Sequence, residues 1–251
     1  MKEKIEEIKR KINNQSKSIH LLAILIFIIL TISTVLIIMF KYHIEGEKNP
    51  PFFISKILVV SVAEGYEQEQ MESKWNFNID QNNDIYITVN KNEDNNNEII
   101  KKVSLENFNI SEPEKGNIKI YKPSEEGIYM NDEKYIVEDR LEYLGSNNPK
   151  LKDIEISNQG GSVLIRISNK EVGKYVSDDE EIIHDGKLLS KTETKLEEIK
   201  FYADFDIIIE TVKGIKYKTN ITLELPTGNI IEEGQNIFEY EKTEDILLKR
   251  I

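Results

Sequence analysis

The segment Asp80–Asp84, with the sequence DQNND, has oxygen-bearing side chains that suit a hard cation. Aspartate, asparagine and aspartate at alternate positions begin many calcium-binding loops. Such a loop also needs a glycine at its sixth position and an acidic residue at its twelfth. Counted from Asp80, those positions hold Ile85 and Lys91, so the segment fails at both. A chain reversal is the other interpretation, because asparagine tolerates the left-handed backbone of tight turns.

The residues on either side of this segment favour the chain reversal. Apolar and polar residues alternate, with Trp75, Phe77 and Ile79 before it and Ile85, Ile87 and Val89 after it. A hairpin that pairs Asp80 with Asp84 places both apolar sets on one face, with Trp75 in the core rather than stacked on a ligand. Like charges directly opposite each other are unfavourable. Two alternatives therefore remain: a loose, solvated turn, or a cation shared by Asp80 and Asp84.

Few other residues point to chemistry. The sequence contains no HExxH, P-loop, GxGxxG or GxSxG motif, and it has no cysteine for a disulfide or a thiolate metal ligand. Only His184, beside Asp185, is a candidate general base. We interpret it as a loop residue, with a Ser-His-Asp site as the alternative, and the acidic run Asp178–Glu181 as a solvated loop. We therefore expect no enzyme activity, and no catalytic, cofactor-binding or metal-binding residues.

Residues 21–40, LLAILIFIILTISTVLIIMF, form the strongest signal: 20 residues without a charge, proline or glycine. A helix of this length spans roughly 30 Å, which is the thickness of the hydrocarbon core of a bilayer. A helix in a soluble core normally has one apolar stripe, whereas this segment is apolar all round. It predicts a transmembrane helix in contact with membrane lipid.

The charges that flank the apolar run predict its orientation. Residues 1–20 carry six Lys or Arg against three Glu, whereas the following KYHIEGEKNPP has only two lysines. The positive-inside rule therefore places a stub of residues 1–20 in the cytosol and residues 41–251 outside. The triplet Ser61-Val62-Ala63 resembles a signal-peptidase site but lies far from the apolar run, so we expect an uncleaved signal anchor. The net charge of −12 disfavours binding to nucleic acid.

Residues 201–225 contain the clearest β-hairpin. A three-residue loop that ends at Gly214 leaves this glycine at the left-handed position such loops require. On the outer face the loop sets Glu210 against Lys216. On the inner face it pairs Phe201 with Leu225, Phe205 with Ile221 and Ile209 with Tyr217.

The chain beyond a polar linker at residues 41–52 is predicted to be mainly β. Further candidate strands lie at 56–62, 99–110, 117–122, 153–157 and 162–168. Many short strands with regular turn signals are typical of an antiparallel β-sandwich, here of immunoglobulin-like (Ig-like) architecture.

Residues 78–91 resemble residues 155–170, since both have an isoleucine, a polar turn signal and three alternating apolar residues. Such a similarity suggests an internal repeat. It predicts two tandem β domains at 53–145 and 146–251, and the alternative is one continuous sandwich.

These features lead to one main functional hypothesis. We expect a single-pass protein of the cell membrane whose extracytoplasmic β domains bind a protein partner or help to assemble a bacterial cell envelope complex, without catalysis. The alternative is a membrane-tethered extracellular hydrolase acting on glycan or peptide, which needs a deep pocket with convergent polar groups. A transmembrane sensor is a third reading, but its inner segment of 20 residues offers little surface for signalling.

Overall fold

The computed structural model describes residues 2–45, 50–68, 75–93, 97–146, 154–177, 186–240 and 243–251. The chain divides into two compact units, Met1–Gly46 and Glu47–Ile251. His184, Asp185 and the acidic run Asp178–Glu181 lie outside the described residues, so the predictions made for them stay predictions.

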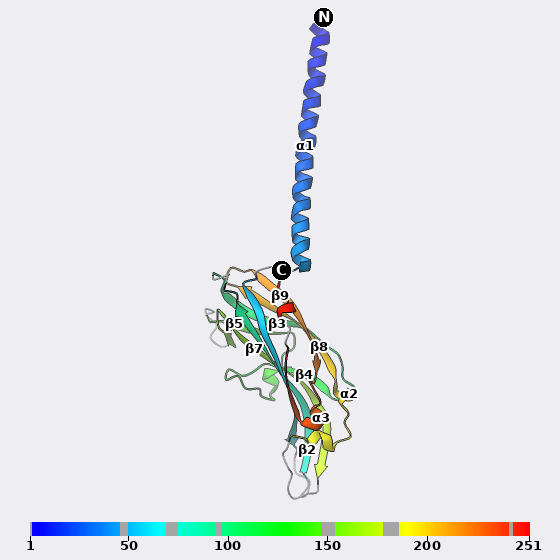
Figure 1. Cartoon of the computed structure of the whole chain (residues 1–251), viewed down its shortest axis with the longest axis vertical. Helices are drawn as coiled ribbons and strands as arrows, with labels where there is room; N and C mark the ends of the chain where they lie inside the picture. The colour runs from blue at the N-terminus through cyan, green and yellow to red at the C-terminus, as the bar shows by residue number, and fades with distance from the viewer. Residues whose placement is uncertain are drawn as a thin grey trace. The chain divides into compact units, whose positions relative to one another are not determined.

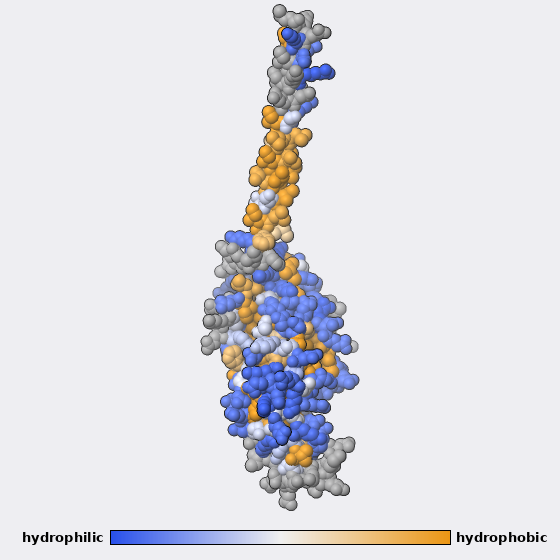
Figure 2. Space-filling model, turned by 90° about the vertical axis from the view of Figure 1, so that its right-hand side faces the viewer, coloured by the Kyte–Doolittle hydropathy of each residue, from blue (hydrophilic) through white to orange (hydrophobic). Residues whose placement is uncertain are grey.

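The first unit is a single helix, α1 (Lys2–Glu45), which contains both the predicted stub and the apolar run. Within α1, the stretch Lys17–Lys41 is long and apolar enough to cross a membrane. Its apolar side chains are exposed, and Figure 2 shows them as an orange band. The hydroxyls of Thr31 and Thr34 donate to carbonyls one turn earlier, both at 2.8 Å, so these polar groups are satisfied within the helix.

The second unit contains two β-sheets (Figure 1). The first sheet has the order β10-β1-β2-β7-β4, with bounds Gln235–Glu239, Phe52–Glu67, Trp75–Lys91, Gly160–Ser177 and Asn117–Tyr121. The second has the order β11-β9-β8-β3-β5-β6, with bounds Lys249–Arg250, Lys216–Leu225, Phe201–Thr211, Ile100–Ile110, Arg140–Gly145 and Glu155–Ile156. The named strand pairs are antiparallel except β5 with β6, which is parallel. The second unit is therefore mainly β, as predicted.

The five further candidate strands overlap β1, β3, β4, β6 and β7, so these predictions are confirmed. Short helical turns join the strands, at Glu133–Tyr135, Leu188–Lys191, α2 (Leu196–Ile199), α3 (Ile230–Glu233) and Thr243–Asp245.

The β8–β9 hairpin is also confirmed in its register. Phe201 pairs with Leu225, Phe205 with Ile221, Ile209 with Tyr217 and Glu210 with Lys216. Gly214 has a φ of +80°, the left-handed conformation that the loop requires. The register is correct because the turn chemistry and the cross-strand pairs are all local to this segment.

The structure does not confirm the tandem domains at 53–145 and 146–251. Each sheet combines strands from both ranges, and Glu47–Ile251 forms one compact unit. The two segments of the proposed repeat also differ in structure. Residues 78–91 belong to one continuous strand, whereas residues 155–170 contain β6, a turn and part of β7. β2 and β7 pair with each other, so their shared alternation reflects two neighbouring strands of one sheet.

The predicted hairpin at Asp80–Asp84 is wrong. β2 runs without a break through the segment, with β1 on one side and β7 on the other. Asp80 pairs with Glu64 of β1, and Asp84 pairs with Val60 of β1 and Arg166 of β7. The two aspartates therefore do not face each other, and the cation proposed to lie between them has no basis in this geometry.

The polar segment also divides the hydrophobic core. Residues of both sheets share one cluster, which includes Ile85 and Phe205. A second cluster around Phe77 and Leu189 lies beyond the polar residues of β2, and Trp75 packs against its edge as a partly buried residue. Between the clusters a buried polar layer consists of Ser61, Gln81, Asn83, Asn169 and Thr227. Hydrogen bonds link Ser61, Asn83 and Thr227 within this layer, and Asn83 Nδ2 also donates to the Ile167 carbonyl at 2.9 Å.

The buried side chain of Asp206, in β8, stabilises the second sheet. β3 has an irregular register between Glu106 and Asn109, and Asn107 adopts a φ of 56° there. The Asp206 carboxylate accepts hydrogen bonds from Asn107 Nδ2 at 2.6 Å and Lys218 Nζ at 2.7 Å. Burial alone raises the pKa of Asp206, but the hydrogen bonds from Lys218, Asn107 and Asn220 outweigh it and lower the pKa below its ordinary value.

Asp206 therefore makes stability depend on pH. A carboxyl whose pKa is lowered by folding stabilises the protein above its unfolded pKa, and this contribution is lost as the pH falls through the lower folded pKa. We expect Asp206→Asn to reduce the free energy of unfolding at neutral pH and to differ progressively less from the parent below pH about 4. Denaturant unfolding across this range measures it. The control Asp139→Asn, at an exposed position, should change the free energy of unfolding at neutral pH much less.

Candidate functional site

A strip of buried and partly exposed polar side chains crosses the middle of the first sheet, on the face opposite the core. We call it the polar strip, and it consists of Glu64, Asp80, Asn82, Asp84, Arg166, Ser168 and Lys170. Successive side chains of a strand point to opposite faces. The odd-numbered Ile85 and Ile165 point into the core, so the even-numbered residues beside them point away from it. Three central strands thus bring five charged groups together.

The strip is built from two complementary triplets. Asp80-x-Asn82-x-Asp84 of β2 runs antiparallel to Arg166-x-Ser168-x-Lys170 of β7. Asp84 accepts two bonds from Arg166, and the second, from Nη2, is 2.9 Å long. Lys170 Nζ lies 2.8 Å from Asp80 Oδ2, and Ser168 donates to Asn82 between these ion pairs. Asp80 and Asp84 therefore pair with different cations, and the amide–hydroxyl pair lies between them.

β1 completes the strip from the other side of β2. Glu64 Oε2 accepts a bond from Asn82 Nδ2 and one from the Tyr66 hydroxyl, both at 2.6 Å. Burial and the bond to Glu64 raise the pKa of Tyr66 to about 12. Tyr66 is thus a neutral hydrogen-bond donor at physiological pH.

The connection from β4 to β5, residues 122–139, lies over part of the strip, and we call it the cover segment. The Tyr129 ring packs on the Arg166 guanidinium, 4.6 Å from its centre, and Asn131 Oδ1 accepts a bond of 2.9 Å from Lys170. Burial raises the pKa of the Tyr129 phenol far above its ordinary value. The two cations therefore link acids on β2 to the cover segment above them.

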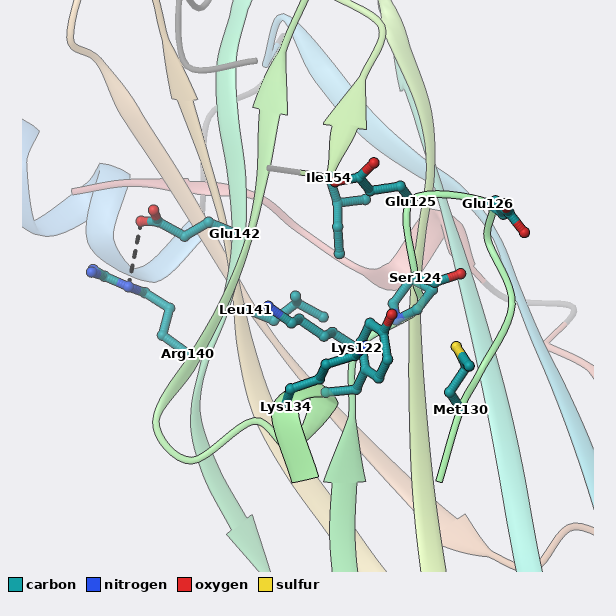
Figure 3. A pocket seen from close by; sticks show the side chains of 12 residues that line it. Lys122, Ser124, Glu125, Glu126, Met130, Lys134, Arg140, Leu141, Glu142 and Ile154 are labelled. Atoms are coloured by element: carbon teal, nitrogen blue, oxygen red, sulfur yellow. Dashed lines mark ion pairs between the residues drawn. The ribbon is translucent and has the colours of Figure 1, made fainter. Parts of the chain in front are cut away.

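The cover segment lines much of a hollow of about 850 Å³, the groove shown in Figure 3. Three basic and three acidic residues line it, namely Lys122, Lys134, Arg140, Glu125, Glu126 and Glu142. Arg140 Nε lies 3.4 Å from Glu142, and Figure 3 shows this pair to one side of Leu141 and Ile154, with Met130 on the other side. The lining residues include no histidine or cysteine. Mixed charge around a small apolar floor suits an extended polar ligand better than a compact apolar one.

Three of the seven residues of the polar strip stand out in the sequence. Asp80, Asn82 and Asp84 were noticed as a possible cation loop, whereas Arg166, Lys170 and Tyr129 were not singled out. Complementary triplets at matching spacing, acid–amide–acid against Arg–Ser–Lys, were the available signal for pairing β2 with β7. Among the described residues, no group of three or more His, Cys, Asp or Glu is placed to hold a metal ion.

Comparison of the chain with models of protein families, with curated proteins and with solved structures found no match. The fold and site alone define the class of protein. It is a mainly β protein with two antiparallel or mixed sheets, preceded by a helix apolar enough to span a membrane.

Removing Asp84 from its ion pair with Arg166 tests how much the polar strip stabilises the protein. Asp84→Ala removes both carboxylate bonds of the Arg166 guanidinium, whose side chain is 12% exposed, and leaves it the longer contact with Glu64 at 4.0 Å. We expect a loss of about 3–5 kcal/mol in the free energy of unfolding, measured by denaturant titration. The control Glu239→Ala breaks the exposed pair with Lys56 and should cost at most about 1 kcal/mol. Equal losses in both variants would contradict the assignment.

Proposed function

We propose that the protein is a single-pass membrane protein whose β unit, outside the cytosol, binds a partner or helps to assemble a complex of the cell envelope. The apolar surface of α1 carries this proposal. Leu21, Phe27 and Ile37 are 72%, 71% and 68% exposed, and such a surface needs lipid around it. The positive charges of residues 1–20 support a cytosolic N-terminus.

The position of the candidate cleavage triplet supports an uncleaved anchor. Ser61, Val62 and Ala63 lie within β1, paired with β2 on one side, and Ser61 is fully buried. Cleavage there would divide a central strand of the first sheet. The proposed architecture of the β unit is an Ig-like sandwich, which the shared cluster between the two sheets supports.

The groove that the cover segment lines is the proposed contact surface. Its charges of both signs, together with the apolar side chains of Leu141 and Met130, suit an extended polar segment of a partner protein. The alternative, a membrane-tethered hydrolase for glycan or peptide, stays a hypothesis without a named acid–base pair, because carboxylates line the groove without a histidine.

The absence of cysteine from the sequence allows a direct test of topology. Single cysteines are introduced by Glu6→Cys, in α1, and by Glu112→Cys, at an exposed position after β3. In intact cells a membrane-impermeant maleimide should label the second variant only, and after permeabilisation it should label both. The protein should remain in the membrane fraction after alkaline washing. Labelling of the Glu6→Cys variant alone in intact cells would reverse the orientation, and release by alkali would remove the anchor.

Site-specific photo-crosslinking tests the binding function. A photoreactive amino acid replaces Met130 in the groove, and in the control it replaces Tyr202, which is 56% exposed on the second sheet. We expect a discrete crosslinked product, identified by mass spectrometry, from position 130 and none from position 202. Recovery of only the uncrosslinked monomer from both positions would count against a partner at the groove.

A further inference from the structure

Three reactive groups from three different segments meet where the cover segment contacts the polar strip. Lys170 Nζ, from β7, lies 2.8 Å from Asp80 Oδ2 of β2 and 2.9 Å from Asn131 Oδ1 of the cover segment. An amine, a carboxamide and a carboxyl group in hydrogen-bond contact are the components of an amide-transfer reaction. We propose that Lys170 and Asn131 form an intramolecular isopeptide bond, with Asp80 carrying the protons.

The backbone of β7 is shaped to hold Lys170 in this position. The register of β2 and β7 shifts between Ile79 and Gln81, so β7 bulges opposite Asp80. Glu171, within the bulge, has a φ of 59°, an unfavourable conformation for a residue other than glycine. Asp80 stabilises it, because Oδ1 accepts the Glu171 N–H at 2.9 Å while Oδ2 contacts Lys170. Bulges and backbone strain of this kind occur where a side chain is aimed at a functional position.

Lys170 and Asp80 are largely shielded from water, whereas Asn131 lies at an exposed position. The Lys170 side chain is 15% exposed, and that of Asp80 is 8% exposed. The rings of Tyr66 and Tyr121 lie 5.4 Å and 5.3 Å from Nζ. A nucleophilic attack needs a neutral amine, and Asp80 Oδ2, 2.8 Å from Nζ, is placed to accept the proton that the amine gives up.

The reaction balances without any added reagent. The neutral Nζ of Lys170 attacks Cγ of Asn131, and a new C–N bond forms. Asp80 delivers its proton to the departing amide nitrogen and takes a proton from the attacking nitrogen. The bond between Cγ and Nδ2 breaks, and the nitrogen leaves as ammonium, which restores the Asp80 carboxylate. Well-oriented groups within one folded chain reach effective molarities on the order of 10⁵–10⁸ M, and an advantage of this kind offsets the low reactivity of a carboxamide.

The bond would fasten the cover segment to the central sheet. It joins residues 131 and 170, and so closes a loop that contains β5, β6 and part of β7. A chain without cysteine has no disulfide for this purpose. The proposal does not depend on the membrane topology or on a partner, so it stands or fails separately from the proposed function.

The test is the intact mass of the full-length protein, followed by peptide mapping. We expect the parent to be lighter than its sequence by one ammonia, and to yield a branched peptide that contains both Lys170 and Asn131. Lys170→Arg keeps a cation opposite Asp80 but removes the nucleophilic amine. This variant should have the full mass and a melting temperature lower by several degrees. Lys174→Arg, at an exposed lysine of the same strand, should retain the loss of ammonia.

Two results would overturn the proposal. One is a parent protein with the full mass and no branched peptide. The other is a loss of ammonia that persists in Lys170→Arg, because that loss would come from another asparagine. If Lys170→Arg does not fold, Asn131→Ala provides the same measurement at an exposed position, and a mass short of one ammonia in this variant contradicts the bond.

Discussion

The pairing of Asp80, Asn82 and Asp84 with Lys170, Ser168 and Arg166 is the constraint on which the first sheet depends. Apolar side chains recur at every second residue on one face of β2 and β7. If β7 shifted by two residues along β2, apolar residues would still lie opposite each other. The polar strip does not tolerate that slip, because Asp84 would then face Ser168 and lose its cation. Leaving a buried charge unpaired costs about 3–5 kcal/mol. The hydrophobic pattern therefore selects the face, and the charges select the register.

The same stretch of β2 shapes the interior. Gln81 and Asn83 point to the core side, where they interrupt the apolar run between Phe77 and Ile85. Asn83 is satisfied by Ser61 and by the Ile167 carbonyl, whereas both polar atoms of the Gln81 side chain are buried and have no partner among the described residues. A polar segment in a central strand thus has consequences on both faces. It builds an ionic strip on one side and separates two hydrophobic clusters on the other.

How far the fold could be predicted depended on where each segment finds its partners. The β8–β9 hairpin was predicted in register because Gly214, Glu210 and Lys216 lie within a few residues of one another. The apolar run of α1 was recognisable from composition alone. β2 was misread because DQNND has the local signature of a turn, and only Arg166, 82 residues away, makes Asp84 compatible with a strand. The contacts of Tyr129 and Asn131 have no local signal at all.

The polar strip also links the sheet to the groove. Most of the cover segment is exposed. Arg166 contacts it through Tyr129, and Lys170 contacts it through Asn131. These two cations form ion pairs with Asp84 and Asp80 of β2. Met130 lies between these two attachment points and lines the groove. The shape of one groove wall is therefore set by two acids that do not line the groove. A segment that resembled a cation loop in the sequence positions a candidate binding surface, and it does so through the protein's own Arg and Lys.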